Sequence, residues 1–154
     1  MTLAVEVSRA PRISGVPSAR LLTRWAAAAA GRRGARAVVS LRVVGPAEGR
    51  RLNRDYRGKD YATNVLSFPA GAIPAVQPRP LGDLVVCASV VTREARAQHK
   101  TARAHWAHLV VHGVLHLLGH DHEGKDDARR MERREVAVLR ALGYANPYRQ
   151  ADRG

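Results

Sequence analysis

Cysteine is almost missing from this chain, because Cys87 is the only one in 154 residues. A disulfide within the chain is therefore impossible, and a reducing compartment suits the protein. Long apolar runs are missing too: the longest, Trp25 to Gly31, is mostly alanine and far shorter than the about 20 residues of a membrane span. The first residues lack the basic and apolar regions of a signal peptide. We expect a soluble, cytoplasmic protein that does not associate with membranes.

Acidic residues are scarce relative to basic ones. The chain has 13 Asp and Glu against 26 Lys and Arg, a net charge of +13, and only three of the basic residues are lysines. Such a surplus favours polyanionic partners, because each neutralised phosphate releases counterions. Arginine adds a forked set of donors that matches phosphate oxygens. A genome-wide preference for arginine codons would give the same composition, so charge alone favours nucleic acid without identifying it.

The pattern along the chain predicts one α+β domain spanning residues 1–154, with no internal repeat or linker. The sheet is expected to be small, mixed and four-stranded, packed with about five or six helices. Alternating or short apolar runs predict strands, and 3.6-residue periodicity predicts helices. The predicted strands are 2–8, 37–44, 64–68 and 84–87; the predicted helices begin at Ser18, Pro46, about Ser89, about Thr101 and about Asp126, and residues 9–17 and 70–80 are predicted loops.

Histidines concentrate in one segment, since five of the seven lie between His108 and His122. His112 and His116 are four residues apart on a predicted apolar helix, so their imidazoles share a face, with Cβ atoms about 5–6 Å apart. That separation fits two nitrogens at about 2.0–2.1 Å from one zinc ion. Neutral imidazoles packed together without a metal would leave polar atoms unpaired. The spacing therefore predicts a zincin-like helix that carries a metal pair.

The third ligand is expected after Gly119, which ends the helix and lets the chain turn back. His120 and His122 both lie in this turn, and spacing leaves the choice between them open. Asp121 is a candidate for orienting an imidazole. His108 is interpreted as a core residue or a partner of the ligands. Three protein ligands would leave one position open for water, as in catalytic zinc sites.

One residue distinguishes this helix from that of the zinc metalloproteases. Their general base is a glutamate directly after the first histidine, where this chain has Gly113. The chain keeps the metal pair but lacks the protease base, which disfavours peptide hydrolysis by that route. A histidine such as His108 is a candidate proton acceptor in its place.

A second segment carries the cations Arg57 and Lys59, on either side of Gly58 in a predicted turn between a helix and a strand. Cations beside a metal would stabilise the charge that develops on a phosphodiester as it is attacked. A solvated basic loop is an equally good interpretation of the spacing alone.

Three motifs in one order complete the pattern: Tyr-Arg-Gly-Lys-Asp with Thr-Asn-Val-Leu-Ser-Phe-Pro at 56–69, Leu-Gly-Asp-Leu-Val-Val-Cys at 81–87, and His-Gly-x-Leu-His-Leu-x-Gly-x-Asp-His at 112–122. Together they resemble the YbeY family of bacterial endoribonucleases and ribosomal RNA maturation factors. The resemblance covers about residues 36–148.

The resemblance implies a zinc site of one ion per chain, held by His112, His116 and His122. It also implies that Arg57 lines the cleft near the metal, so that Arg57 and His112 are the catalytic candidates and Arg57 and Lys59 the substrate-binding ones. The implied activity is zinc-dependent cleavage of RNA, preferentially single-stranded. The implied role is small-subunit ribosomal RNA 3′-end maturation and ribosome quality control, with ribosomal RNA, the small subunit and possible ribosomal proteins as partners.

Two other functions fit parts of the pattern. A metal-dependent hydrolase of a small molecule or peptide would use the same histidines, although Gly113 and the +13 charge disfavour it. A non-catalytic ribosome-assembly factor would use zinc structurally. An open coordination position with bound water would argue against that second alternative.

Overall fold

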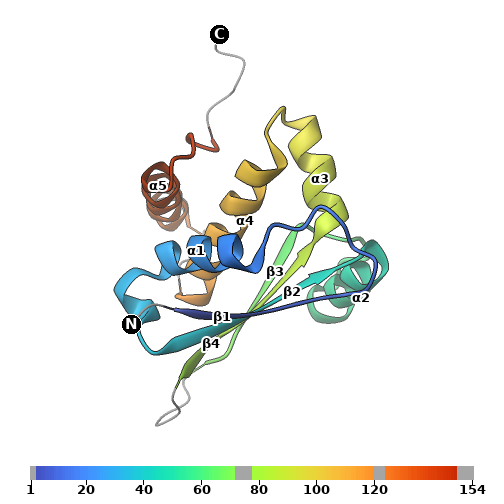
Figure 1. The fold of residues 1–154 in the computed structure, drawn as a ribbon, viewed down its shortest axis with the longest axis horizontal. Coiled ribbons are helices and arrows are strands. Elements are labelled where there is room, and N and C mark those ends of the chain that lie inside the picture. Colours follow the sequence, from blue (N-terminus) through green and yellow to red (C-terminus); the bar gives the residue numbers. More distant parts are fainter. Residues whose placement is uncertain (1–2, 72–77, 120–123, 149–154) are drawn as a thin grey trace.

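The structure is a computed structural model that describes residues 3–71, 78–119 and 124–148. Strands and helices alternate in the first half of the chain, and helices dominate the second half (Figure 1). The elements are β1 (Ala4–Arg9), α1 (Ala19–Ala30), a short 3-10 helix η1 (Gly31–Gly34), β2 (Ala37–Val44), α2 (Pro46–Arg57), β3 (Val65–Pro69), β4 (Arg79–Cys87), α3 (Ala88–Ala97), α4 (Ala102–Leu117) and α5 (Lys125–Ala141).

Local signals set the ends of the helices, as the sequence predicts. The Leu21 N–H donates to the hydroxyl of the N-cap residue Ser18 at 3.2 Å, which satisfies one of the unpaired donors at the start of α1. Pro46 begins α2, where its missing N–H costs nothing. Gly58 ends α2 in the left-handed region, at a φ of 71°.

The sheet is mixed and has the order β1-β2-β4-β3. β1, β2 and β4 run parallel, whereas β3 pairs antiparallel with β4 and forms one edge. The predicted α+β class with a mixed four-stranded sheet is confirmed.

The predicted start of the last strand was wrong. β4 begins at Arg79 rather than Leu84, so Arg79 and Pro80 belong to the sheet and not to a loop. Pro80 has no N–H to donate, and the pairing with β2 shifts by one residue directly after it, between Val38 and Val39. Gly82 follows, where a Cβ would lie 2.4 Å from the Phe68 carbonyl oxygen, so glycine is required for β3 to approach.

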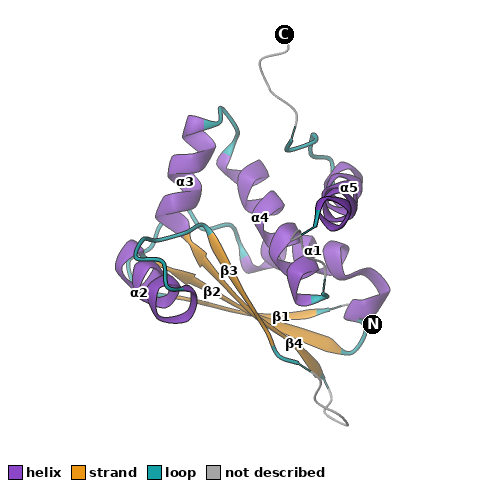
Figure 2. Cartoon of the chain, turned by 180° about the vertical axis from the view of Figure 1, so that it is seen from behind, coloured by secondary structure: helices purple, strands orange, loops and turns teal. Residues whose placement is uncertain are grey.

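Helices cover both faces of the sheet. α1 and α4 lie across one face and α2 lies on the other, while α5 packs against α4 and α1 (Figures 1 and 2). Leu84 and Val86 of β4 belong to the main core under α4, whereas Cys87 points to the α2 side, where it is buried with Val44 and Val90. Ten of the 16 residues of α4 are buried, which makes it the central helix. Within the described residues, no helix is both long and apolar enough to cross a lipid bilayer.

Candidate metal centre

The central helix α4 carries a row of four histidines. Thr101 caps its first turn, accepting a hydrogen bond from the Ala104 N–H at 3.1 Å. His105, His108, His112 and His116 then follow at intervals of three or four residues, so their rings lie along one side of the helix. Successive ring centroids are 6.2, 6.2 and 4.8 Å apart. The predicted pair His112 and His116 is the closest of these.

Packing explains the glycine between the two predicted ligands. A Cβ at Gly113 would lie 2.8 Å from Cδ2 of Leu84 and 3.5 Å from the hydroxyl of Ser67. The Ser67 hydroxyl also donates to the Gly113 carbonyl, at 3.4 Å. Position 113 therefore faces the sheet at close range, and the glycine that the sequence shows in place of the protease glutamate is what lets α4 lie against β3 and β4.

A buried carboxylate from α5 stands behind the histidines. Glu135 is fully buried, and its two oxygens contact Nδ1 of His112 at 2.5 Å and Nε2 of His108 at 3.0 Å. The Tyr148 hydroxyl donates to the second of these oxygens. Burial alone would raise the pKa of Glu135, but the hydrogen bonds from His108, His112 and Tyr148 outweigh it and lower the pKa to about 2. The carboxylate is therefore ionised near neutral pH.

Tyr148 is held in its neutral form by the same contact. Burial, together with the hydrogen bond to Glu135 and the negative charge of that carboxylate, raises the pKa of its hydroxyl well above the usual value. The neutral hydroxyl can only donate to the carboxylate, which gives Glu135 its third donor.

These contacts decide how His112 presents its ring. A carboxylate bound to Nδ1 fixes the tautomer and orientation of an imidazole, as it does for most histidines that bind a metal. Ligand atoms of His108, His112 and Glu135 lie within 4.8 Å of one another, so this group could hold a metal ion directly. Because both Glu135 oxygens already accept hydrogen bonds, orienting His112 fits its contacts better than ligation does. The donor set around α4 therefore fits a metal.

The structure tests only part of the predicted site. His112 and His116 lie together, whereas the remaining predicted ligand His122, with His120 and Asp121, lies outside the described residues. His108 is hydrogen-bonded to Glu135 through Nε2, and its Nδ1 is buried with no partner among the described residues. Neither nitrogen of His108 is thus open to take a proton from water.

The basic turn is built on buried Asn53. The Asn53 side-chain amide donates to the Tyr61 carbonyl at 2.8 Å, and the Lys59 N–H donates to the Asn53 carbonyl at 3.3 Å. Arg57, Lys59 and Tyr61 line a cavity of about 160 Å³ together with Asn53, Thr63, Val65 and Leu66. No histidine lines this cavity, so the described residues do not bring Arg57 and Lys59 into one pocket with His112.

A second hydrogen-bond network connects the start of β3 to α4 through α3. Asn64 donates through its side-chain amide to Glu94 of α3 at 3.0 Å, and the same Glu94 oxygen lies 2.9 Å from Nε2 of buried His105. Burial lowers the pKa of His105, although the contact with Glu94 opposes the effect. The turn, α3 and α4 are thus held in one arrangement.

Sequence reasoning missed Glu135, Tyr148 and Glu94. A signal for Glu135 exists in α5, where it lies four residues after Met131 and four before Leu139, both buried. An acidic residue on the apolar face of a helix indicates a buried partner. Nothing comparable marks Tyr148, which is partly exposed.

The fold and the site define a class: an α+β protein whose buried helix carries closely spaced histidines beside a buried carboxylate, a group that could hold a metal ion. Comparison with known proteins identifies the family within it. Residues 17–143 match the family model described as Endoribonuclease YbeY. The chain is 58% identical over 140 residues to Endoribonuclease YbeY from Alkalilimnicola ehrlichii, covering 88% of this chain and 84% of the relative. Its identity to the protein of the same name from Stenotrophomonas maltophilia strain R551-3 is 52% over 151 residues, covering 95% and 93%.

A solved structure agrees with the fold. The solution structure of TM1509 from Thermotoga maritima matches with a TM-score of 0.57 and 25% identity, covering 97% of this chain and 98% of that one. The chain belongs to the endoribonuclease YbeY family. The predictions of an enzyme that cleaves RNA and of a metal-binding site are thereby confirmed.

Proposed function

We propose that this chain is a zinc-dependent endoribonuclease that prefers single-stranded RNA and acts on ribosomal RNA in the cytoplasm. Its proposed tasks are maturation of the small-subunit RNA 3′ end and ribosome quality control, with the small subunit and its proteins as partners. We propose a single domain, residues 1–154, for this activity. The relatives' shared name, endoribonuclease, supports the reaction.

The contact between His112 and Glu135 is the observation that carries the proposal. It holds Nδ1 of His112 at 2.5 Å from a fully buried carboxylate, the arrangement that orients histidines which bind a metal. A purely structural packing of histidines gives no reason to bury an ionised carboxylate behind them, because burying a charge is costly. Zinc is favoured over harder cations because the proposed ligands are imidazoles.

Each proposed residue has one task. His112, His116 and His122 would hold the zinc, which when bound supplies Lewis acidity toward the phosphodiester and water. Glu135 keeps the His112 ring in place. Arg57 would neutralise charge that develops on the phosphate, and Lys59 would bind the RNA backbone nearby. We do not assign His108 as proton acceptor, because Glu135 occupies its Nε2.

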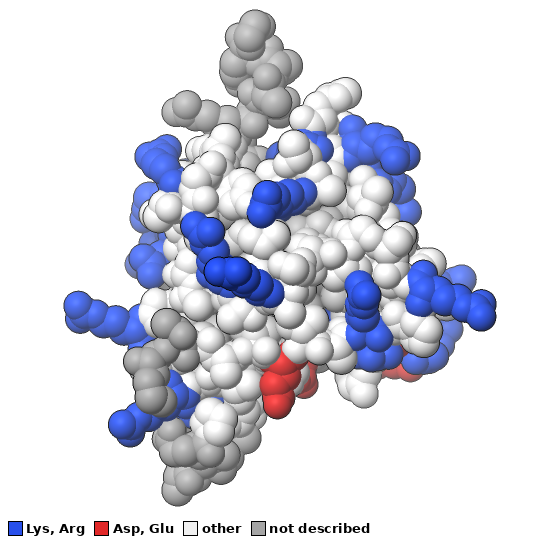
Figure 3. Space-filling model, viewed as in Figure 1, with Lys and Arg blue, Asp and Glu red and all other residues white. Residues whose placement is uncertain are grey.

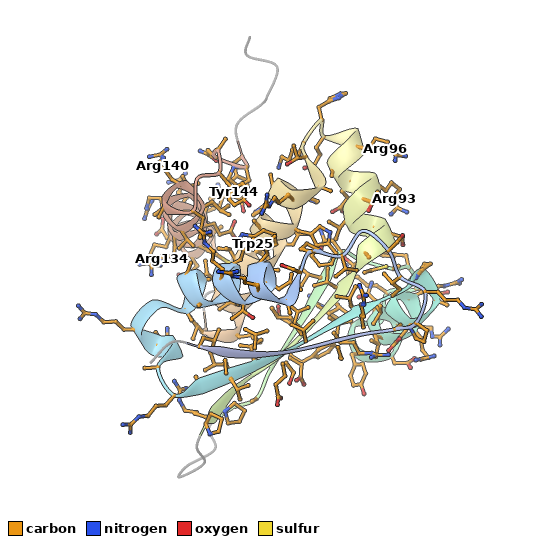
Figure 4. All side chains as sticks on the ribbon, in the orientation of Figure 1. Trp25, Arg93, Arg96, Arg134, Arg140 and Tyr144 are labelled. Carbon is orange, nitrogen blue, oxygen red and sulfur yellow. The ribbon has the colours of Figure 1, made fainter. Side chains whose placement is uncertain are left out.

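Surface charge supports an RNA substrate. Basic side chains are spread over the face shown in Figure 3, where acidic ones are few. Arg93 and Arg96 extend from α3, and Arg134 and Arg140 from α5 (Figure 4). Among the described residues, no carboxylate pairs with Arg57 or Lys59, although the neighbouring Arg50 is bound by Asp60 at 2.7 Å. Unpaired cations remain available for phosphates.

Two alternatives remain distinguishable from this proposal. A hydrolase of another substrate would keep the zinc and show no RNA cleavage. A non-catalytic assembly factor would bind ribosomal RNA without cutting it, and its zinc would have four protein ligands.

The proposal is tested by incubating the full chain with a structured small-subunit RNA fragment and mapping the products. The protein is used as purified, after chelation, and after restoring zinc. We expect cleavage in single-stranded segments that is lost on chelation and regained with zinc, and no cleavage by His116→Ala. Equal cleavage with and without metal, or none by the zinc-loaded protein, would contradict the proposal.

A further inference from the structure

An aromatic pair lies on the surface at the end of α2. Tyr56 of α2 and Phe68 of β3 meet edge to face, with ring centroids 5.4 Å apart and an interplanar angle of 70°. Tyr56 is 69% exposed, and Phe68 is only partly buried. An edge-to-face contact uses one ring's edge, so it leaves ring surface of Tyr56 open to solvent.

Exposure of these rings is costly unless something covers them. Burying an aromatic side chain removes about 150–250 Å² of surface from water, which is favourable. Phe68 is the only phenylalanine in the chain, yet it lies on an edge strand beside the most exposed tyrosine. A third ring, Tyr61, lies nearby in sequence and is 55% exposed. These three aromatic side chains therefore lie at the surface, where they add little to the hydrophobic core.

The charge around the pair points to the occupant. Between Pro46 and Tyr61 the chain has five basic residues and three acidic ones. Two of the acidic residues, Asp55 and Asp60, are taken up by Arg54 and Arg50. Arg57 directly follows Tyr56 and, like Lys59, has no carboxylate partner among the described residues. Exposed rings interleaved with cations are the feature that binds single-stranded nucleic acid, through base stacking and phosphate contacts.

Phe68 lies on β3, the strand that contacts α4. Phe68 projects toward α2, while the preceding residue Ser67 donates to the Gly113 carbonyl on the other side of β3. Gly113 directly follows the proposed ligand His112. Because β3 is an edge strand, an RNA strand crossing that edge would meet the aromatic pair on one face of the sheet and α4 on the other face.

We propose that Tyr56 and Phe68 form a base-stacking platform that binds one unpaired nucleobase of the RNA substrate beside the scissile segment, an inference that rests on the proposed endoribonuclease function. A base stacks on the open face of Tyr56, Phe68 holds the tyrosine ring in place, and Arg57 and Lys59 bind the adjoining backbone. Bases in a duplex have their faces covered by their neighbours, so the platform selects single strands.

The test measures binding separately from cleavage. A fluorescently labelled 2′-O-methyl oligoribonucleotide is titrated with the full zinc-loaded chain and binding is followed by anisotropy, with a gel showing that the probe stays intact. The variants are Tyr56→Ala, Tyr56→Phe and Lys59→Ala. A second probe of the same length carries abasic sites in place of its bases.

Tyr56→Ala is expected to weaken binding of the normal probe about 5- to 150-fold, the range for loss of one stacked base. Tyr56→Phe should bind within about twofold of wild type, since the ring remains. Neither substitution removes a positive charge, so the slope of affinity against salt stays unchanged, whereas Lys59→Ala makes it shallower. The abasic probe should bind wild type and Tyr56→Ala equally.

Three results would overturn the platform. Equal binding of the normal probe by wild type and Tyr56→Ala removes it while leaving the proposed cleavage intact. A loss in Tyr56→Ala that persists with the abasic probe shows that the ring does not contact bases. Failure of wild type to bind either probe contradicts the RNA substrate itself, and the proposed function falls with the platform.

Discussion

The histidine row of α4 and the basic turn after α2 treat charge in opposite ways. Around Glu135 the charge is buried, and every oxygen of the carboxylate is engaged by His108, His112 or Tyr148. In the turn, Arg57 and Lys59 are exposed and have no acidic partner among the described residues. In the first region the polar side chains pair with one another. In the second region the cations have no acidic partner within the described chain and can bind a ligand.

This difference separates side chains that fix a metal ligand in place from side chains that bind the substrate. A metal ligand must be fixed before the metal arrives, so its ring needs a partner inside the protein. A phosphate-binding cation needs the opposite, because a partner within the chain would compete with the substrate. Substitutions near Glu135 should therefore act on stability and metal affinity together, whereas substitutions in the turn should act on RNA alone.

The largest expected effect concerns the third ligand. His122→Ala should abolish zinc binding, reducing about one zinc per chain to none, because two imidazoles alone hold the ion poorly. His120→Ala is the matched control and should retain zinc. Elemental analysis of protein purified after growth with zinc measures both. Retention of zinc by His122→Ala together with its loss from His120→Ala would reassign the ligand.

Removal of the buried carboxylate comes next. Glu135→Ala should lower the free energy of unfolding by about 3–5 kcal/mol, since it leaves the donors of His108, His112 and Tyr148 without their acceptor. Zinc affinity should fall about 10- to 100-fold because the His112 ring is no longer oriented. Urea unfolding and competition with a chelating dye give the two numbers. Exposed Glu132 on the same helix serves as control, and an equal effect of Glu132→Ala would show that the contact has no special role.

Arg57→Ala should reverse this pattern. The rate of RNA cleavage is expected to fall about 10²- to 10³-fold, the typical cost of losing one group that stabilises transition-state charge. Unfolding free energy should change by less than about 0.5 kcal/mol, because the side chain is exposed. Arg93→Ala, at an exposed position of α3, controls for general loss of positive charge. Cleavage at the wild-type rate by Arg57→Ala would remove the arginine from the site.

The smallest effect is a pH dependence at His105. Because burial lowers its pKa in the folded state, the unfolded chain takes up a proton at His105 near its usual value of 6.5 while the folded chain does so only at lower pH. The contribution of neutral His105 to the free energy of unfolding is thus fully present above about pH 6.5, and it declines as the pH falls toward the pKa of the folded state. The difference in unfolding free energy between wild type and His105→Gln should shrink from pH 7.5 to 5.5. A difference that stays constant over this range would contradict the shift.

Much of the fold could be predicted because its signals are local. Ser18, Pro46 and Gly58 mark helix ends through contacts within a few residues. The first half of β4 could not be predicted, because Pro80 argues against a strand and only the shifted pairing with β2 accommodates it. That pairing joins segments about 40 residues apart.

The site follows the same rule. The His112–His116 pair is visible in sequence because one helical turn brings the two residues together. Glu135 lies 23 residues beyond His112, and only the packing of α5 on α4 places it there. The Tyr56–Phe68 pair likewise needs the crossing of α2 and β3. Partners fixed by tertiary packing leave little trace in local sequence.

X-ray absorption at the zinc edge tests the central claim most directly, because it reports the ligands of the ion in the full-length, zinc-loaded protein. The account predicts three imidazole nitrogens at about 2.0–2.1 Å and one further light atom that exchanges with solvent. A spectrum with four protein ligands, or with a carboxylate such as Glu135 bound in place of an imidazole, would contradict it.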